Sequence, residues 1–145
     1  MDGFTTRAIR AATRAPRVDQ RPTSVPIYQT ATFSAAGSAG AYIDMSSGTF
    51  NNNGTFTAGS AYPLNFRGMG GTNVFNNAGT FIKQDASTCR FYIYYSGVAF
   101  NNTGTVDVQA GSLSLETGGT SDGAFNLAAS TTISLNGTHA ISSPA

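Results

Sequence analysis

The chain has 145 residues, and only 10% of them are charged, with eight Lys and Arg against seven Asp and Glu. Globular proteins carry about 25% charged residues, and here Gly, Ser, Thr, Asn and aromatic residues take their place. This mixture favours strands and tight turns over helices. No apolar run reaches the roughly 18 residues of a membrane helix. We therefore expect an all-β protein without membrane insertion and without a nucleic-acid partner.

The first 33 residues differ in charge from the rest. They carry five arginines against two aspartates, a net of +3, whereas three basic and five acidic residues give residues 34–145 a net of −2. Such a shift predicts a boundary near residue 34, with an extended or partly disordered arm over 1–33 and a second segment over 34–145. The arm has no apolar core typical of a secretory signal, so no signal peptide is visible.

The stretches Thr6–Ile9 (TRAI) and Pro26–Phe33 (PIYQTATF) resemble the N-terminal arm of the pyridoxal-phosphate enzymes of Cys/Met metabolism, such as cystathionine γ-synthase. In that family the arm lies across a partner subunit near the cofactor. The resemblance implies a fragment of a trans-sulfuration enzyme. However, Lys83, in FIKQD, is the only lysine and does not match the family's Ser-x-Thr-Lys stretch. We therefore expect no cofactor and no catalysis by this route.

A repeat of 25 residues dominates the second segment. Phenylalanine recurs at this interval, and Asn, Asn, Gly and Thr columns follow it, as in FNNNGTF, FNNAGTF and FNNTGTV. A constant period predicts stacked coils of a parallel β-solenoid. An array of antiparallel hairpins is the alternative. The phenylalanines and the first asparagines of the repeat are Phe50, Phe75, Phe100, Phe125, Asn51, Asn76, Asn101 and Asn126.

Stacking places each residue over the residue 25 positions later, about 4.8 Å away. The four phenylalanines should then form an interior stack, and the asparagines should form hydrogen-bonded ladders along the coils. The recurrent Gly54, Gly79 and Gly104 should supply positive φ at a bend. Open ends of such a solenoid expose unpaired strands, so we expect self-association through them.

Alternation of apolar residues locates the strands within each coil. Leu64 and Phe66, Val106 and Val108, and Leu113 and Leu115 share interior faces. The stretch RFYIYYSGVAF predicts Phe91, Ile93 and Tyr95 inside the coil. Tyr92 and Tyr94 would then point outward, where they could contact a carbohydrate or a protein partner.

Residues 41–141 resemble the repeat regions of bacterial autotransporter passengers and filamentous-haemagglutinin-like adhesins. GVAFNNTGTVDVQAGSLSL, residues 97–115, and GAFNLAASTTISLNGTH, residues 123–139, carry this likeness. The resemblance implies a β-helix that is extracellular or on the cell surface and acts as a stalk or an adhesive surface.

No arrangement of reactive residues predicts an enzyme. His139 is the only histidine and has no partner nearby in the sequence, and Cys89 is the only cysteine. A carbohydrate-active β-helix enzyme remains an alternative, but Asp85, Asp107 and Asp122 fall in different columns of the repeat. We therefore expect no catalytic, cofactor or metal site, and a structural or adhesive function.

Overall fold

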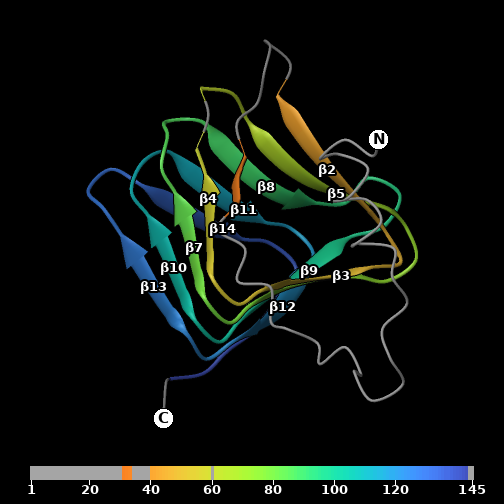
Figure 1. Cartoon of the computed structure of the whole chain (residues 1–145). Coiled ribbons are helices and arrows are strands. Elements are labelled where there is room, and N and C mark those ends of the chain that lie inside the picture. The colour runs from red at the N-terminus through yellow and green to blue at the C-terminus, as the bar shows by residue number, and fades with distance from the viewer. Residues whose placement is uncertain (1–30, 34–39, 60, 144–145) are drawn as a thin grey trace, which may run out of the picture.

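The computed structural model describes residues 31–33, 40–59 and 61–143, and every regular element in these ranges is a β-strand (Figure 1). The strands form three parallel sheets of five strands each. In spatial order, sheet A contains β1 (Ala31–Phe33), β4 (Thr55–Ala58), β7 (Thr80–Lys83), β10 (Thr105–Val108) and β13 (Ala124–Leu127). Sheet B contains β2 (Ala41–Ser46), β5 (Leu64–Gly70), β8 (Thr88–Tyr92), β11 (Ser112–Leu115) and β14 (Thr132–Leu135). Sheet C contains β3 (Thr49–Asn52), β6 (Asn73–Asn77), β9 (Val98–Asn102), β12 (Gly118–Ser121) and β15 (Thr138–Ile141).

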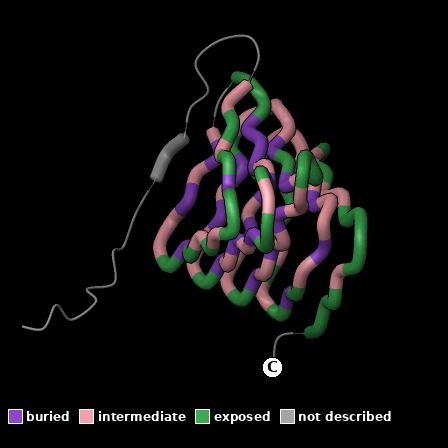
Figure 2. Tube along the Cα trace, turned by 90° about the vertical axis from the view of Figure 1, so that its right-hand side faces the viewer, coloured by how far each residue is buried: buried purple, intermediate pink, exposed green. Residues whose placement is uncertain are grey.

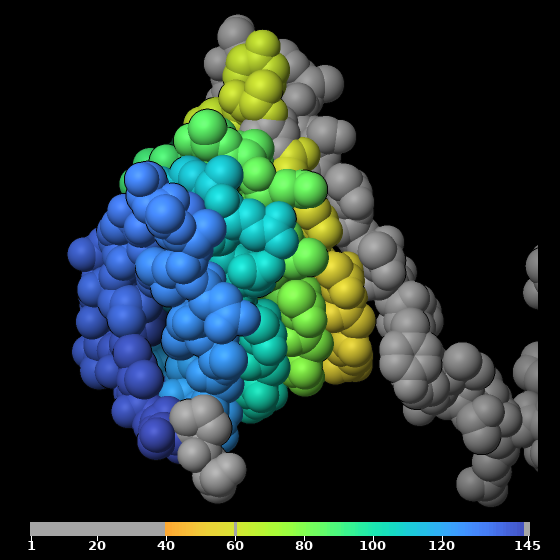
Figure 3. Space-filling model, turned by 90° about the vertical axis from the view of Figure 1, so that its left-hand side faces the viewer, coloured from red at the N-terminus to blue at the C-terminus, as the bar shows by residue number. Residues whose placement is uncertain are grey.

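The chain visits sheets B, C and A in turn, so three successive strands make one coil of a parallel β-solenoid. Figure 3 shows these coils as layers that change from yellow to blue along the solenoid axis. All named strand pairs are parallel, from the β2–β5 pair to the β12–β15 pair. The predicted solenoid is therefore confirmed, and the antiparallel hairpin array is wrong.

The period of 25 holds for three coils and then breaks. Asn52, Asn77 and Asn102 lie one above another at intervals of 25, but the next residue in their column, Ser121, follows after only 19. Most of this shortening lies between sheets B and C: the connection contracts from residues 93–97 to residues 116–117, and β11 and β12 are each one residue shorter than β8 and β9.

This contraction corrects the fourth copy of the repeat. Phe125 lies on β13 in sheet A, where it pairs with Val106, and the position next to Phe100 in sheet C is taken by Gly119. Asn126 likewise pairs with Asp107. The prediction that both residues continue the columns of the first three coils is therefore wrong. An interval of 25 in the sequence no longer equals one turn at this point.

Phenylalanine rings fill the interior of the first three coils. In sheet C, the ring centroids of Phe50 and Phe75 are 4.9 Å apart and those of Phe75 and Phe100 are 5.4 Å apart, with interplanar angles of 5° and 7°. Phe81 and Phe91 meet Phe75 edge to face, at 5.8 Å and 5.2 Å. Stacked and edge-to-face pairs stabilise beyond the area they bury. The core is thus a triangular aromatic column. The prediction that side chains point to the interior of the coils is confirmed for Leu64, Phe66, Phe91, Val106, Val108, Leu113 and Leu115.

Asparagine side chains form two ladders along sheet C. In the buried ladder, Nδ2 of Asn52 donates to Oδ1 of Asn77 at 2.7 Å, and Nδ2 of Asn77 donates to Oδ1 of Asn102 at 2.8 Å. The outer ladder runs in the opposite direction, since Asn76 donates to Asn51 at 2.9 Å and Asn101 donates to Asn76 at 3.0 Å. Its next rung is Thr120, whose backbone N–H donates to Oδ1 of Asn101 at 3.0 Å.

The recurrent glycines serve close packing between coils. None of Gly54, Gly79 and Gly104 has positive φ, so the predicted reason for them is wrong. A Cβ at Gly79 would lie 2.1 Å from the carbonyl oxygen of Gly54, and one at Gly104 would lie 2.1 Å from that of Gly79. The column continues at Gly123, where a Cβ would lie 2.2 Å from the carbonyl oxygen of Gly104. Only a residue without a side chain fits at this corner.

The predicted N-terminal arm lies mostly outside the described residues, which begin at Ala31. Its last three residues form β1, which pairs in parallel with β4. The solenoid thus already includes residues 31–33, which the charge pattern assigned to the arm. Among the described residues there is no helix with the length and hydrophobicity needed to cross a membrane.

Candidate ligand-binding face

Aromatic and charged side chains gather on the outer face of sheet B and on the connection that follows it. The strand register places Tyr42 beside Asn65 and Asn65 beside Arg90 across β2, β5 and β8. In the next outward row, Asp44, Arg67 and Tyr92 follow one another. We call Tyr42, Arg67, Arg90, Tyr92, Tyr94 and Tyr95 the tyrosine–arginine face.

Arg67 holds the first half of this face together. Its guanidinium makes two hydrogen bonds to the carboxylate of Asp44, at 2.7 Å and 2.8 Å. The same guanidinium lies 3.8 Å from the ring centroid of Tyr42 and 5.2 Å from that of Tyr94. The hydrogen bond with Asp44 raises the pKa of Arg67 further above its ordinary value, against some desolvation. Arg67 is therefore a fixed cation that orients two tyrosine rings.

Arg90 repeats this arrangement two coils from Tyr42. It donates to Oε1 of Glu116 from Nε at 2.9 Å and from a terminal nitrogen at 2.7 Å. Its guanidinium carbon lies 4.9 Å from the ring centroid of Tyr92. Both arginines of the face are thus paired with a carboxylate, so their positive charges are locally balanced.

Tyr94 and Tyr95 lie on the long connection that makes the third coil wider than the fourth. The ring centroids of Tyr92 and Tyr94 are 6.3 Å apart, and those of Tyr94 and Tyr95 are 4.6 Å apart. Strand β8 ends at Tyr92, and the backbone N–H groups of Tyr95 and Ser96 then donate to the carbonyl of Gly68. The in–out alternation therefore stops at Tyr92.

This connection corrects part of the expected orientation. Ile93 is 58% exposed and Tyr95 is 72% exposed, so the prediction that they point inward is wrong. Tyr94 is 49% exposed, as expected for an outward side chain, and Tyr92 is partly buried between its neighbours. Tyr42 and Arg67 were missed by sequence reasoning. A signal for Arg67 existed, because it lies one period of 25 before Tyr92.

A shallow open groove of about 500 Å³ crosses this face, lined by Tyr42, Pro63, Asn65, Thr88, Arg90 and Tyr92. Its floor consists of neighbouring strands of sheet B, so its shape is set by backbone pairing and not by a flexible loop. Two tyrosine side chains, an amide and a guanidinium among its lining residues provide aromatic surface and hydrogen-bonding groups in one groove.

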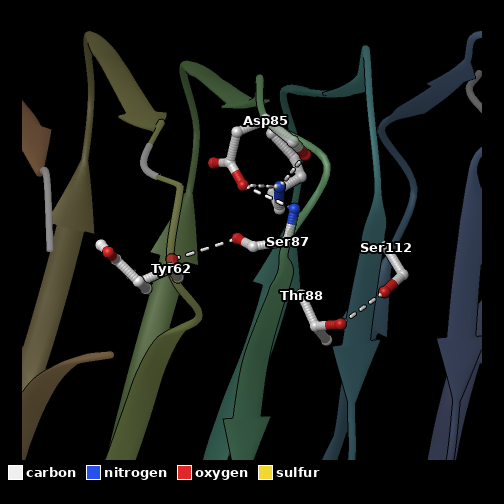
Figure 4. Close-up of polar contacts among 6 residues, drawn as sticks. Tyr62, Asp85, Ser87, Thr88 and Ser112 are labelled. Carbon is white, nitrogen blue, oxygen red and sulfur yellow. Dashed lines mark hydrogen bonds and ion pairs between the residues drawn. The ribbon is translucent and has the colours of Figure 1, made fainter. Parts of the chain in front are cut away.

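The only lysine of the chain belongs to the core at the corner between sheets A and B. The side chain of Lys83 is 1% exposed, and its Nζ donates to the backbone carbonyl of Asp85 and lies 3.1 Å from Oδ1 of Asp85. That carboxylate also accepts the backbone N–H of Ser87 at 2.7 Å, and the Ser87 hydroxyl donates to the carbonyl of Tyr62 at 3.1 Å (Figure 4). This network closes the corner and joins neighbouring coils.

The other reactive side chains do not form a second cluster. Cys89 is completely buried close to Lys83 and Asp85, and this burial raises the pKa of its thiol well above the ordinary value. His139 lies on β15, where its Nε2 is 3.2 Å from the carbonyl oxygens of Leu115 and Asn136. Asp85, Asp107 and Asp122 lie on β7–β8, β10 and β12–β13 segments, respectively. In the described ranges, no group of three His, Cys, Asp or Glu could hold a metal ion.

The architecture defines the class of this protein, a parallel β-solenoid with asparagine ladders and an aromatic core. The chain matches no protein-family model, and no curated protein and no solved structure shows significant similarity to it.

Proposed function

We propose that this chain is a non-enzymatic structural and adhesive segment of a secreted or cell-surface protein, and that its tyrosine–arginine face binds a neutral saccharide chain. The observation that carries the proposal is an open groove on a rigid sheet, lined by Tyr42 and Tyr92 and continued by the exposed Tyr94 and Tyr95 beside Tyr92. Tyr42 and Tyr94 are 48% and 49% exposed although each ring lies near Arg67. Tyrosine rings held in this way offer large contact area with little loss of rotamer entropy on binding.

The charge balance of the face supports a neutral ligand. The guanidinium of Arg67 is paired with Asp44, and that of Arg90 with Glu116. An acidic polysaccharide would have to compete with these carboxylates for the arginines, and it would meet their negative charge at the same surface. A neutral sugar can stack on the tyrosine rings and hydrogen-bond to Asn65 and the hydroxyl groups without disturbing either ion pair.

The alternatives that the sequence left open find less support. A pyridoxal-phosphate enzyme requires an accessible lysine, whereas Lys83 is enclosed in the core and its ammonium is held by Asp85. A carbohydrate-cleaving enzyme requires acidic groups near one bond, whereas Asp107 and Asp122 lie in different parts of the coil. Binding without cleavage agrees better with this distribution.

Affinity electrophoresis through gels that contain neutral or uronic-acid polysaccharides tests the proposal. We expect neutral polymers to retard the protein, and we expect Tyr42→Ala to weaken binding about tenfold, as the loss of one stacked ring should. Tyr42→Phe keeps the ring and loses one hydroxyl group, so it should weaken binding much less than Tyr42→Ala does. Thr103→Ala, at an exposed position on the corner between sheets C and A, controls for general effects.

Far-UV circular dichroism must show that each variant keeps its strands. Retardation by acidic polymers alone, abolished by salt, would overturn the choice of a neutral ligand. If no polysaccharide retards the protein, or if Tyr42→Ala binds as well as Tyr42→Phe does, the face is not a saccharide site.

A further inference from the structure

The C-terminal end of the solenoid exposes its core. No residue from Asp122 to Ser143 is buried, and the chain that leads to the C-terminus is green, meaning exposed, in Figure 2. Leu127, Leu135 and Ile141 are 49%, 40% and 57% exposed. A hollow of about 220 Å³ opens between the three sheets there, lined by Phe125, Leu127, Ile133, Leu135 and Ile141. In the preceding coils the corresponding space is filled by the next layer of side chains.

The strands at this end are also open along their edges. Within the part of the chain that the structure describes, β13, β14 and β15 are the last strands of sheets A, B and C, and each pairs with a neighbour on one side only. An open parallel edge presents unpaired N–H and C=O groups and readily accepts another strand. An occupant of this end must therefore supply three parallel strands in a triangular arrangement, together with apolar side chains between them.

The N-terminal end of the same solenoid has these properties. Its first strands in the three sheets are β1, β2 and β3, and among the described residues each of them pairs with a strand on one side only. Ala41, Ile43 and Phe50 pack only partly against the core there, as Phe125 and Ile133 do at the other end. Both ends are thus incomplete layers of one continuous core.

The order in which the chain visits the three sheets also matches between the two ends. The described chain starts with a strand of sheet A and ends with a strand of sheet C, and each sheet contains five strands. A second copy placed after the first would therefore continue the order of sheets without a missing strand. Strand β1 would follow β13, β2 would follow β14, and β3 would follow β15.

The side-chain columns continue across this junction. The column that starts at Ile43 passes through Phe66 and Phe91 and ends at Leu135, so the junction places Ile43 next to Leu135. In the same way, the register of sheet C places Phe50 next to His139.

We propose that the C-terminal face of this solenoid, formed by β13, β14 and β15, binds the N-terminal face of a second copy, so that copies assemble head to tail into a continuous three-sheet filament. The contact is heterologous, since it joins two different faces, and it leaves both faces free at the ends of each assembly. Such a contact propagates instead of closing into a dimer. This proposal does not depend on the saccharide site, which lies on the side of the solenoid.

Sedimentation velocity of the full chain over a range of concentrations provides the first test. We expect the average mass to rise with concentration, and we expect Ile141→Glu to weaken association tenfold or more, since it places a charge in the apolar junction. Ile93→Glu is the matched control, because Ile93 is 58% exposed on the lateral face and Ile141 is 57% exposed at the end. The control should assemble as the unmodified chain does.

Directed disulfide formation tests the register independently. The proposed junction places Thr49 of one copy next to Thr138 of another, at the spacing of neighbouring strands, which a disulfide can span. Oxidation of a mixture of Thr49→Cys and Thr138→Cys proteins should give covalent dimers, whereas each protein alone should assemble without forming a disulfide at the junction. Cys89 is buried and does not compete.

Three results would overturn the proposal. The unmodified chain could remain monomeric up to its solubility limit. Ile93→Glu could disperse the assemblies as well as Ile141→Glu does, which would indicate association through the lateral face. The mixed cysteine variants could fail to form more dimer than either variant alone. The last experiment decides the matter even if Ile141→Glu does not fold.

Discussion

Replacing Asn77 by alanine tests how much the buried asparagine ladder contributes to the fold. Asn77 is 1% exposed and occupies the central rung. It accepts a hydrogen bond from Asn52 at 2.7 Å, and its Nδ2 donates to Oδ1 of Asn102 at 2.8 Å and to the carbonyl of Thr105 at 2.9 Å. Alanine removes all three hydrogen bonds and leaves Oδ1 of Asn102, in a fully buried side chain, without this donor.

The expected cost follows from these contacts. Three hydrogen bonds at about 1 kcal/mol each, with a further 1–2 kcal/mol or so for the buried acceptor left unsatisfied, lower the free energy of unfolding by about 4–5 kcal/mol. A domain of this size has a stability of roughly 5–15 kcal/mol. Asn77→Ala should therefore unfold at a much lower urea concentration, or fail to fold at ambient temperature.

Asn76→Ala is the matched control, because Asn76 is the adjacent residue on the same strand and belongs to the outer ladder. It also loses two side-chain hydrogen bonds, at 2.9 Å and 3.0 Å, but water can replace them on the outer surface. We expect a loss below about 1 kcal/mol. Equilibrium urea denaturation monitored by far-UV circular dichroism measures both. Equal losses in the two variants, or a loss below about 1 kcal/mol for Asn77→Ala, would refute the argument from burial.

Three further predictions follow from the core. Gly79→Ala should destabilise the solenoid by several kcal/mol, since its Cβ would meet a carbonyl oxygen at 2.1 Å, whereas Gly48→Ala, with no atom within 4 Å, should be neutral in the same denaturation assay. Phe75→Ala should cost about 3–5 kcal/mol, because it removes the ring between two stacked neighbours. The buried thiol of Cys89 should resist alkylation at pH 9 until the protein unfolds. Because its pKa is raised in the folded state, stability should fall as pH rises above the unfolded value, by up to about 1.4 kcal/mol per pH unit, and Cys89→Ala should lack this slope.

The sequence by itself determined the architecture of the first three coils. The interval between Phe50, Phe75 and Phe100 matches one turn, and the same spacing aligns Asn52, Asn77 and Asn102. Identical residues at a constant spacing along the chain can all contact their counterparts in the next coil only if the coils stack in register. Stacking of the rings and hydrogen bonding of the amides stabilise that register, so the repeat by itself predicts the solenoid.

Only part of the candidate binding face could be predicted from the sequence. The outward direction of Tyr94 was predicted from alternation along an expected strand, but the same alternation wrongly placed Ile93 and Tyr95 inside, because it ends where β8 ends at Tyr92. Arg67 pairs with Asp44, because the β2–β5 register is 23 residues and not the 25 of the repeat. The repeat interval of 25 therefore does not predict this ion pair, although it does separate Arg67 from Tyr42.

Tertiary structure alone decided where the repeat breaks and why its glycines are needed. Phe125 keeps the interval in the sequence but enters sheet A, because the preceding connection lost residues and strand pairing follows the backbone of the neighbouring coil. Gly79 and Gly104 are required by the carbonyl oxygen of the coil beside them and not by their own φ angles. Sequence periodicity records how far apart residues lie along the chain, whereas hydrogen bonds between coils determine which residues become neighbours.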